Sequence, residues 1–406
     1  MASLPERRSR EIRAARVSRR PPSYSVTLAA LVIVFALAWV FFLRSGPPVP
    51  TPTVEGIRGM YTWDPGTGRP SEDGAFSAVA SGNAGGDVAM PSGTTAGGRR
   101  PTASAYDAAT RTETTVGDGM IGWYGISIGD WPPVWRVATH SPLDYQGLSA
   151  IVRSAVEDRD DTVGIKPLED DGRAVWRAAM TLSGQQVDLV VDQQTGIVTW
   201  YADERATFTA SVDWESPPPA DQTYSIDSRG LPARTARGDV TYVASPAAAG
   251  RSAGYDPLVS DLAPDAYALK AAATFDQGFR VGVWVRGVAV GPPGDAPDEP
   301  GIALLYTRGL NRMTVEQIGP KATRYYSGML RDELGATARH KLSYQETTLQ
   351  YGAFKGSTAS TWYQESGPSL LVAGERRAVF VTGALTRQEL IAFAEGLKPV
   401  TAGAPE

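Results

Sequence analysis

The longest apolar run of the chain lies near its start. Residues 24–43 read YSVTLAALVIVFALAWVFFL and carry no charge. A helix of this length rises about 30 Å, which matches the hydrocarbon core of a bilayer. The preceding residues, 1–23, include seven arginines. Because basic residues mark the cytoplasmic side of a span, the pattern predicts a basic cytoplasmic tail at 1–23 and a single-pass anchor in the cell membrane at 24–43. The bulk of the chain is then expected to be extracytoplasmic.

A cleaved signal peptide would also begin with a basic region and an apolar core. Here the apolar run is longer than the usual core of about 7–15 residues, and the sequence FFLRSGPPVPTP after it has no small-x-small cleavage site. We therefore expect an uncleaved signal-anchor. The proline-rich residues 44–53 that follow are expected to form a stiff extended spacer, because proline fixes φ and favours polyproline II.

Short stretches of alternating apolar and polar residues dominate the chain after the spacer, with glycine-rich and Asp-rich turns between them. This pattern is typical of antiparallel sheet. The clearest hairpin runs from Gln186 to Tyr201, with the turn DQQTG at 192–196. The preceding run, 175–182, alternates so that Trp176 and Met180 share one face. On the return strand, Val198 and Trp200 are expected to share a face.

Two helices have well-marked starts. Ser141 is followed by Pro142 and Asp144, which is the signature of a capped N-terminus, and an apolar stripe runs to Val156. Near the end of the chain, Thr386 and Glu389 form a capping box before a second apolar stripe, and Pro399 is expected to stop that helix.

The remaining pattern divides the chain into two halves. Residues 54–231 are expected to form a β-rich domain, 232–254 a linker rich in Ala, Arg, Gly and Ser, and 255–402 a second domain with both strands and helices. Expected strands in and before the second half are 208–214, 258–273, 279–290, 302–306, 313–317, 346–355, 358–364, 369–373 and 376–382, and a helix is expected at 321–334. The fold class is therefore α+β.

Composition narrows the range of functions. The first 23 residues hold seven of the 39 basic and two of the 44 acidic residues, so the rest of the chain has a formal charge of −10. This acidic balance argues against a nucleic-acid partner. The chain has no cysteine, which excludes disulfides, thiol nucleophiles and iron–sulfur ligation. Only six of the 39 basic residues are lysine, which is typical of a GC-rich genome such as that of an actinobacterium.

The sequence shows no assembled catalytic set. The two histidines, His140 and His340, lie in polar surroundings, and two histidines without thiols make a poor metal site. The carboxylate runs 157–161 and 169–171 lack the spacing of a calcium loop and are typical of solvated turns. The G-x-G-x-x-G at 117–122 is followed by WYGIS instead of a helix, which favours a tight turn between strands. We expect no enzyme activity, no metal and no cofactor. A hydrolase is the least favoured interpretation, because a Gly-x-Ser-x-Gly elbow is absent.

Tryptophan is the unusual feature of the extracytoplasmic part, which holds nine of the ten tryptophans. Most are expected in the core of a disulfide-free sheet protein, but some are candidates for lining an apolar pocket. The candidate ligand-binding residues are Trp123, Tyr124, Trp135, Trp176, Met180 and Trp200. A pocket of this kind suits an acyl chain, and replacing Trp176 or Trp200 by alanine is then expected to release lipid without unfolding.

Several segments between about 188 and 399 resemble a known family. LVVDQQTGIVTWYAD at 189–203 is similar to a hairpin of lipoprotein-carrier domains in the LolA/LolB-like superfamily. DLAPDAYALKAAATF at 261–275 resembles the entry to the second domain of MucB/RseB-like proteins, although Asp265 and Ala266 stand where relatives have proline and glycine. YTRGLNRMTVEQ at 306–317 and AVFVTGALTRQELIAFAEGLKP at 378–399 are similar to the closing strand and helix of such domains.

The resemblance implies both a fold and a function. The implied fold is a LolA-like curved antiparallel half-barrel with helices, followed by a smaller α+β C-terminal domain. The implied function is binding of a lipid or of lipoprotein acyl chains in an apolar concavity, as a carrier or sensor. The alternative is an envelope-stress regulatory module that binds another membrane protein, such as an anti-sigma factor. A deep apolar groove would favour lipid, whereas a filled core with an exposed patch would favour a protein partner.

Overall fold

The computed structural model describes residues 49, 52–66, 68, 70–80, 103–107, 112–117, 120–125, 134–137, 141–219, 233–236, 240–261, 267–275, 297–334 and 341–400, with backbone alone for 103–137 and 233–236. The tail at 1–23, the anchor at 24–43 and the strand expected at 279–290 lie outside these residues. Within the described ranges, no helix is long and apolar enough to cross a membrane. Residues 47–406 form one compact unit.

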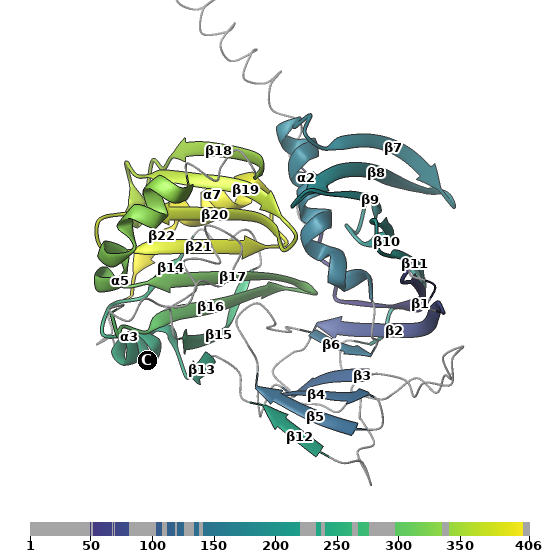
Figure 1. Cartoon of the computed structure of the whole chain (residues 1–406), viewed down its shortest axis with the longest axis horizontal. Helices are drawn as coiled ribbons and strands as arrows, with labels where there is room; N and C mark the ends of the chain where they lie inside the picture. The colour runs from purple at the N-terminus through teal and green to yellow at the C-terminus, as the bar shows by residue number, and fades with distance from the viewer. Residues whose placement is uncertain are drawn as a thin grey trace, which may run out of the picture. The chain divides into compact units, whose positions relative to one another are not determined.

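The first large sheet has eight antiparallel strands and carries one long helix. Its strands, in spatial order, are β6 (Val134–Val137), β2 (Glu72–Ala80), β1 (Gly56–Asp64), β11 (Thr207–Val212), β10 (Val198–Ala202), β9 (Gln185–Asp192), β8 (Arg173–Leu182) and β7 (Gly164–Asp170). The helix α2 (Gln146–Asp158) packs on one face of this sheet through Leu148, Ile151 and Val152 (Figure 1). Burial of these aliphatic side chains against β8 and β9 holds the helix in place.

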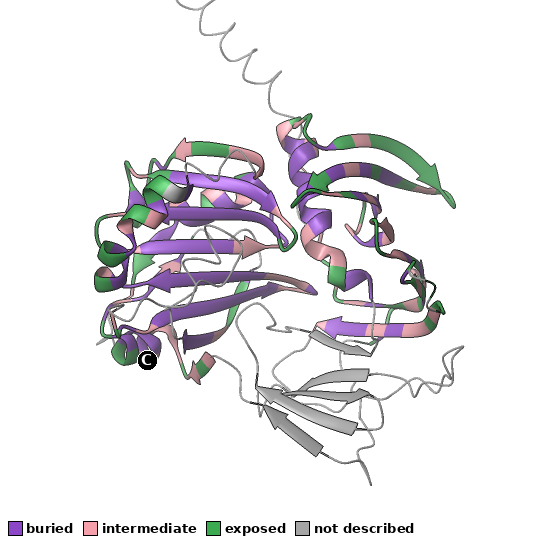
Figure 2. Ribbon diagram, in the orientation of Figure 1, coloured by how far each residue is buried: buried purple, intermediate pink, exposed green. Residues whose placement is uncertain are grey.

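A second eight-stranded antiparallel sheet follows. Its strands, in spatial order, are β13 (Val240–Val243), β15 (Ala268–Phe275), β16 (Gly301–Arg308), β17 (Asn311–Ile318), β21 (Ala378–Gly383), β20 (Gly367–Ala373), β19 (Thr358–Gln364) and β18 (Leu342–Thr348). Its central strands β16, β17, β20 and β21 are almost wholly buried (Figure 2). Both faces are covered, which explains why these strands read as continuous apolar runs instead of alternating ones.

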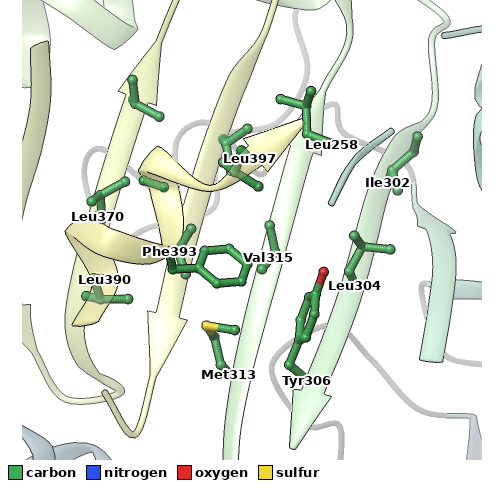
Figure 3. Packing of buried hydrophobic residues seen from close by; sticks show 14 of the residues in the cluster. Leu258, Ile302, Leu304, Tyr306, Met313, Val315, Leu370, Leu390, Phe393 and Leu397 are labelled. Atoms are coloured by element: carbon green, nitrogen blue, oxygen red, sulfur yellow. The ribbon is translucent and has the colours of Figure 1, made fainter. Parts of the chain in front are cut away.

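Different helices cover the two faces of the second sheet. One face packs against α3 (Pro246–Ala253) and α7 (Arg387–Glu395), where Phe393 meets the ring of Tyr306 edge-on at a centroid distance of 5.4 Å (Figure 3). The other face packs against α5 (Pro320–Tyr325) and a π-helical turn, η2 (Met329–Glu333), through Tyr326 and Leu330. This arrangement places η2 beside the end of the sheet that carries β18.

Two smaller sheets complete the described strands. β12 (Ala233–Ala236), β5 (Met120–Gly125), β4 (Thr112–Gly117) and β3 (Ala103–Asp107) form a four-stranded sheet, and β14 (Leu258–Ser260) pairs with β22 (Leu397–Pro399). The G-x-G-x-x-G segment is confirmed as the hairpin between β4 and β5, in which Gly117 pairs with Met120. The segment expected to be a linker, 232–254, contains β12, β13 and α3.

The α+β class and the predominance of antiparallel strands are confirmed, and both large sheets are open, with an edge strand at each end. The half-barrel curvature and the division into domains stay predictions. Both capping boxes are confirmed. Ser141 caps a 3-10 turn, η1 (Pro142–Tyr145), that leads into α2, and Thr386 caps α7 with reciprocal hydrogen bonds to Glu389.

Three expectations about strands are wrong in detail. Val198 and Trp200 do not share a face, because a bulge between them pairs Val198 with Val191 but Trp200 with Val190. The strand expected at 346–355 runs instead from Leu342 to Thr348, and a 3-10 turn, η4 (Gly352–Phe354), follows it. Residues 258–273 form two strands, β14 and β15, that belong to different sheets.

The end of the proline-rich spacer is bound to the folded unit. The carbonyl oxygen of Pro52 accepts a hydrogen bond from Asn311 Nδ2 at 2.5 Å, and Thr53 Oγ1 accepts one from Arg308 Nε at 2.6 Å. The backbone N–H of Leu310 donates to the carbonyl of Val54 at 2.7 Å. The last two residues of the expected spacer, Pro52 and Thr53, are therefore attached to the folded unit, and the extended conformation of the rest of 44–53 stays a prediction.

Candidate functional site

A groove opens between η2 and the ends of strands β18, β19 and β20. Its volume is about 360 Å³. Apolar side chains from η2 and β20 form part of its lining, and hydroxyl and charged groups from β18 and the strand ends form the rest. The lining residues are Leu330, Arg331, Leu334, Tyr344, Glu346, Ser357, Thr358, Ser360, Leu371, Ala373, Gly374 and Glu375.

The polar side of the groove is organised by Tyr344. Its hydroxyl donates to Glu346 Oε1 at 2.9 Å and lies 3.0 Å from Ser360 Oγ. Strand pairing places these groups together, because Glu346 on β18 lies opposite Ser360 on β19. Tyr344 precedes Glu346 by two positions on β18, so the two side chains share a face of the strand. Burial, together with the hydrogen bond to Glu346, raises the pKa of Tyr344 above its usual value, so its hydroxyl stays protonated and keeps donating to Glu346.

The groove continues along the helical segment. A second hollow of about 250 Å³ shares Leu330, Arg331, Ala373, Gly374 and Glu375 with the first, and Thr323, Arg324 and Ser327 complete its lining. Together the two hollows follow the sheet end from β18 past η2 toward α5. The resulting groove is elongated, and it presents apolar surface beside carboxylates and guanidinium groups.

The groove lies over one face of the sheet, across the paired residues Glu346, Ser360 and Leu371, and it reaches the edge strand β18. β18 is the last strand in the order, so within the described part of the chain no further strand pairs with its outer edge. An unpaired edge exposes backbone N–H and C=O groups, which an extended peptide can use to add a strand. The apolar and polar lining beside the edge then offers places for alternate side chains of that peptide. A hydrocarbon chain in the groove would displace water from the carboxyl group of Glu346 without replacing its hydrogen bonds.

Of the six residues expected to bind a ligand, the structure describes the side chains of three, Trp176, Met180 and Trp200, and these three do not line one pocket. Trp176 and Met180 lie on the face of β8 that α2 covers and are packed in a buried cluster with Ile151 and Leu189. Trp200 lies on the opposite face of the same sheet, with the guanidinium of Arg177 at 5.8 Å from its ring centre. The remaining three stand on strands of different sheets, Trp123 and Tyr124 on β5 and Trp135 on β6, and their side chains lie outside the description.

Sequence reasoning missed the groove because its lining comes from four separate segments. Tyr344 precedes the strand that the alternation predicted, and Leu330 and Leu334 read as ordinary core positions of a helix. The signal in the sequence was a pair of glycine-containing turns, one at 356 just before β19 and one at 374 just after its neighbour β20. The turns alone, however, are typical of any antiparallel sheet.

The described residues add no catalytic or metal constellation to this groove. No group of three or more His, Asp or Glu side chains is placed to hold a metal ion within the described ranges. His140 and His340 lie outside those ranges. Of the carboxylate runs, Glu169, Asp170 and Asp171 are exposed at the turn between β7 and β8, whereas Glu157, Asp158 and Asp160 lie where α2 meets the second sheet.

Comparisons with known proteins give structural matches and no sequence match. No protein-family model matches the chain, and no curated protein is similar to it. The structure of the Pseudomonas aeruginosa MucA/MucB complex is similar at 10% identity and a TM-score of 0.24, over 85% of this chain and 93% of that chain. A crystal structure of MucB is similar at 12% identity and a TM-score of 0.22, over 87% and 95%.

A structure of PNGF-II is similar at 7% identity and a TM-score of 0.21, over 83% of this chain and 69% of that chain. MucB, which the sequence already resembles, is thus among the solved structures to which this chain is similar. At these TM-scores the matches give no residue-by-residue correspondence, and functional conclusions depend on the contacts within this chain.

Proposed function

We propose that this protein is a single-pass envelope protein whose extracytoplasmic part binds an extended segment of another membrane protein in the groove beside β18. The anchor at 24–43 and the arginines before it support the membrane topology. The resemblance of the sequence to MucB/RseB-like proteins suggests a partner such as an anti-sigma factor and a role in envelope stress. In this proposal the protein binds and does not catalyse.

The observation that carries the proposal is the combination of an unpaired sheet edge with an elongated groove of mixed lining. A peptide presents backbone donors and acceptors to the edge and side chains of alternating character to the groove. Leu330, Leu334 and Leu371 offer apolar contacts, while Tyr344 and Ser360 offer hydroxyl groups. Such a surface suits a polypeptide better than an acyl chain.

Lipid binding is the second candidate. Trp176, which the sequence suggests as a pocket residue, is only 9% exposed and packs under α2. If a lipid is held there, it must share the space with Leu148, Ile151 and Val152 of the helix. The two candidates make opposite predictions about the composition of the purified protein, which allows a direct test.

The protein-partner proposal is tested by photocrosslinking in the membranes of the organism's own cells. A photoreactive phenylalanine analogue is placed in the full chain at Thr358, an exposed residue at the groove, and in a matched variant at Thr181, an exposed residue on β8 of the first sheet. We expect one membrane protein to be captured from position 358 and not from position 181. Equal capture at both positions, or none at either, would contradict the proposal.

A groove-filling substitution makes the test specific. Ala373 lines both hollows, so Ala373→Trp is expected to abolish the crosslink from position 358. The matched control, Ala174→Trp, places the same side chain at an exposed position of β8 and should leave the crosslink unchanged. Circular dichroism of both variants checks that the loss does not come from unfolding.

The lipid candidate is tested by mass spectrometry. Residues 47–406, which form one compact unit, are exported in a bacterial host, purified without detergent and extracted with organic solvent. A heat-denatured and washed sample serves as control. A stoichiometric acyl lipid would favour a carrier or lipid sensor over the protein-partner proposal. A clean extract, repeated after incubation with envelope lipids, would remove the lipid candidate.

A further inference from the structure

The C-terminal end of α2 meets the N-terminus of α7 in a buried polar junction. Arg387, the first residue of α7, donates through Nη1 to Asp158 Oδ2 at 2.8 Å and through Nη2 to the carbonyl oxygen of Ser343 at 2.7 Å. The backbone N–H of Arg387 donates to Ser154 Oγ of α2 at 2.9 Å. The first and second sheets are therefore joined through charged groups and not only through apolar contact.

Glu157 lies inside this junction, where its surroundings are unfavourable for an ionised carboxylate. Its side chain is 5% exposed, it shares a hydrogen bond with the side chain of Thr386, and its Oε2 atom has no hydrogen-bond partner among the described residues. A buried carboxylate oxygen without a donor bears the full cost of lost hydration if the group is ionised.

The charges around Glu157 do not balance. On α2 and the turn after it are the carboxylates of Asp158 and Asp160, and on α7 is the carboxylate of Glu389. Together with Glu157 these make four acids, and three guanidinium groups, those of Arg153, Arg387 and Arg308, oppose them. Arg153 is 2% exposed and donates through Nη2 to the carbonyl of Ala384 at 3.3 Å, and Arg387 is held by Asp158. The other titratable groups that face Arg153 or Arg387 are Tyr267 and Tyr363.

The surroundings favour the neutral form of Glu157. Burial raises its pKa to about 6, the negative charges of Asp158 and Glu389 act in the same direction, and the hydrogen bond with Thr386 and the charge of Arg153 oppose them. The pKa of the nearby Asp160 is shifted in the opposite direction. Burial alone would raise its pKa, but hydrogen bonds from Ser343 and Thr162 and the charge of Arg387 hold it below the usual value. Glu157 therefore takes up a proton at a higher pH than Asp160 does.

We propose that protonation of Glu157 strengthens the contact between α2 and α7, so that this junction tightens in a mildly acidic medium and loosens toward neutral pH. The inference is independent of what the groove binds. Because the folded part is proposed to lie outside the cytoplasm, the junction would respond to the pH of the cell's surroundings.

The direction of the effect follows from linkage. A carboxyl group whose pKa is higher in the folded than in the unfolded protein binds more protons when folded, so its contribution to stability is full below the unfolded value of 4.5. That contribution is lost as pH rises through about 6. The effect is opposite to that of the ion-paired aspartates, which lose stability when the pH falls.

The first experiment compares melting temperatures of the full chain, purified in detergent, with those of Glu157→Gln between about pH 5 and 7.5. We expect the melting temperature of the wild-type chain to fall by roughly 2–4 °C across this range relative to that of Glu157→Gln, which carries a neutral isostere throughout. Glu169→Gln, at an exposed position of β7, is the matched control and should follow the wild type. Parallel curves for wild type and Glu157→Gln would overturn the proposal.

The second experiment reports on the junction itself and uses the absence of cysteine from the chain. Ala384, 2% exposed, lies beside Arg153, so a thiol introduced by Ala384→Cys reacts with a maleimide only when the junction opens. At pH 7.5 we expect labelling about tenfold faster with Glu157 than with Glu157→Gln, and nearly equal rates at about pH 5. Comparison at the same pH removes the effect of thiol ionisation. Equal rates at both pH values would contradict the proposal even if the melting temperatures differed.

Discussion

The guanidinium of Arg387 lies 2.8 Å from the carboxylate of Asp158, although 229 positions separate the two residues. The pair joins the first residue of α7 to the last residue of α2. The guanidinium also lies 4.5 Å from the ring centre of Tyr363, on β19. This one side chain therefore links the helix of the first sheet to a helix and a strand of the second.

Arg387→Ala is expected to lower the free energy of unfolding by about 3 kcal/mol or more, because it leaves the carboxylates of Asp158 and Asp160 buried without their cation. Arg387→Lys should recover only part of this loss, since an ammonium group cannot reproduce the forked contacts to Asp158 and Ser343. Urea denaturation measures both. The exposed Arg376→Ala is the control and should change the free energy by no more than about 0.5 kcal/mol. Similar losses for Arg387→Ala and Arg376→Ala would show that the buried ion pair does not stabilise the fold.

Trp176→Ala is expected to lower the free energy of unfolding much more than Trp200→Ala. Trp176 is buried under α2, so its truncation should cost about 3–5 kcal/mol of unfolding free energy. Trp200 lies on the other face beside Arg177, and its truncation should cost about 1 kcal/mol or less. Urea denaturation of the two variants, with lipid extraction of each, checks this. Loss of a bound lipid without loss of stability in Trp176→Ala would favour the pocket interpretation instead.

Asp192→Asn is expected to destabilise the fold at neutral pH. The Asp192 carboxylate accepts hydrogen bonds from Arg173 Nε at 2.7 Å and from the backbone N–H and Oγ1 of Thr195 at 2.7 and 2.6 Å. Burial alone would raise the pKa of Asp192, but these donors hold it below the usual value. An asparagine amide is uncharged, so its hydrogen bonds with Arg173 and Thr195 are weaker than those of the carboxylate. We expect the free energy of unfolding to fall by about 1–3 kcal/mol.

The same variant also tests how the stabilisation by Asp192 depends on pH, and the lowered pKa determines the direction of that dependence. A lowered pKa in the folded state means that the stabilisation by Asp192 is present above the unfolded value of 3.8 and is lost as the pH falls below it. The difference in unfolding free energy between wild type and Asp192→Asn should therefore shrink toward zero between about pH 4 and 2. Asp188→Asn, on the same strand, serves as control. A difference independent of pH would contradict the assigned role of the carboxylate.

Asn311→Ala is expected to release the end of the proline-rich segment. Asn311 Nδ2 donates to the carbonyl of Pro52, next to the hydrogen bond between Arg308 and Thr53. Loss of one such hydrogen bond, worth about 1 kcal/mol, should raise the labelling rate of a thiol introduced by Val54→Cys about fivefold. The exposed Gln186→Ala on β9 is the matched control. An unchanged rate in Asn311→Ala would show that the remaining contacts, among them the hydrogen bonds from Arg308 to Thr53 and from Leu310 to Val54, are sufficient to hold the segment.

The features that the sequence predicted well are those encoded within a few neighbouring residues. The capping boxes of Ser141 and Thr386 each need a hydroxyl and a carboxylate three positions apart, and both formed as expected. The turn at 192–196 is similarly local, because Asp192 binds Thr195 and Gly196 adopts a φ of +69°. In each case the interaction that shapes the backbone is present in the pattern itself.

The errors arose where pairing between distant strands overrode the local pattern. Alternation placed Val198 and Trp200 on one face, but the bulge in β10 moved Trp200 to the opposite face. A single extra residue reverses the orientation of the side chains that follow it, and only the partner strand sets its position. The candidate groove was missed for a related reason, since Tyr344, Ser360 and Leu330 come together only when β18, β19 and η2 are assembled.

The sequence alone determined the α+β class, the caps of two helices and the principal hairpin, whereas the membrane topology expected from the uncharged run at 24–43 stays a prediction. Local hydrogen bonds and side-chain periodicity are sufficient for these. Only the tertiary structure decided which faces are buried, where the groove lies, and that Glu157, Asp158 and Arg387 share one junction. Burial and charge proximity depend on contacts between segments hundreds of positions apart, and the order of residues along the chain does not specify those distances.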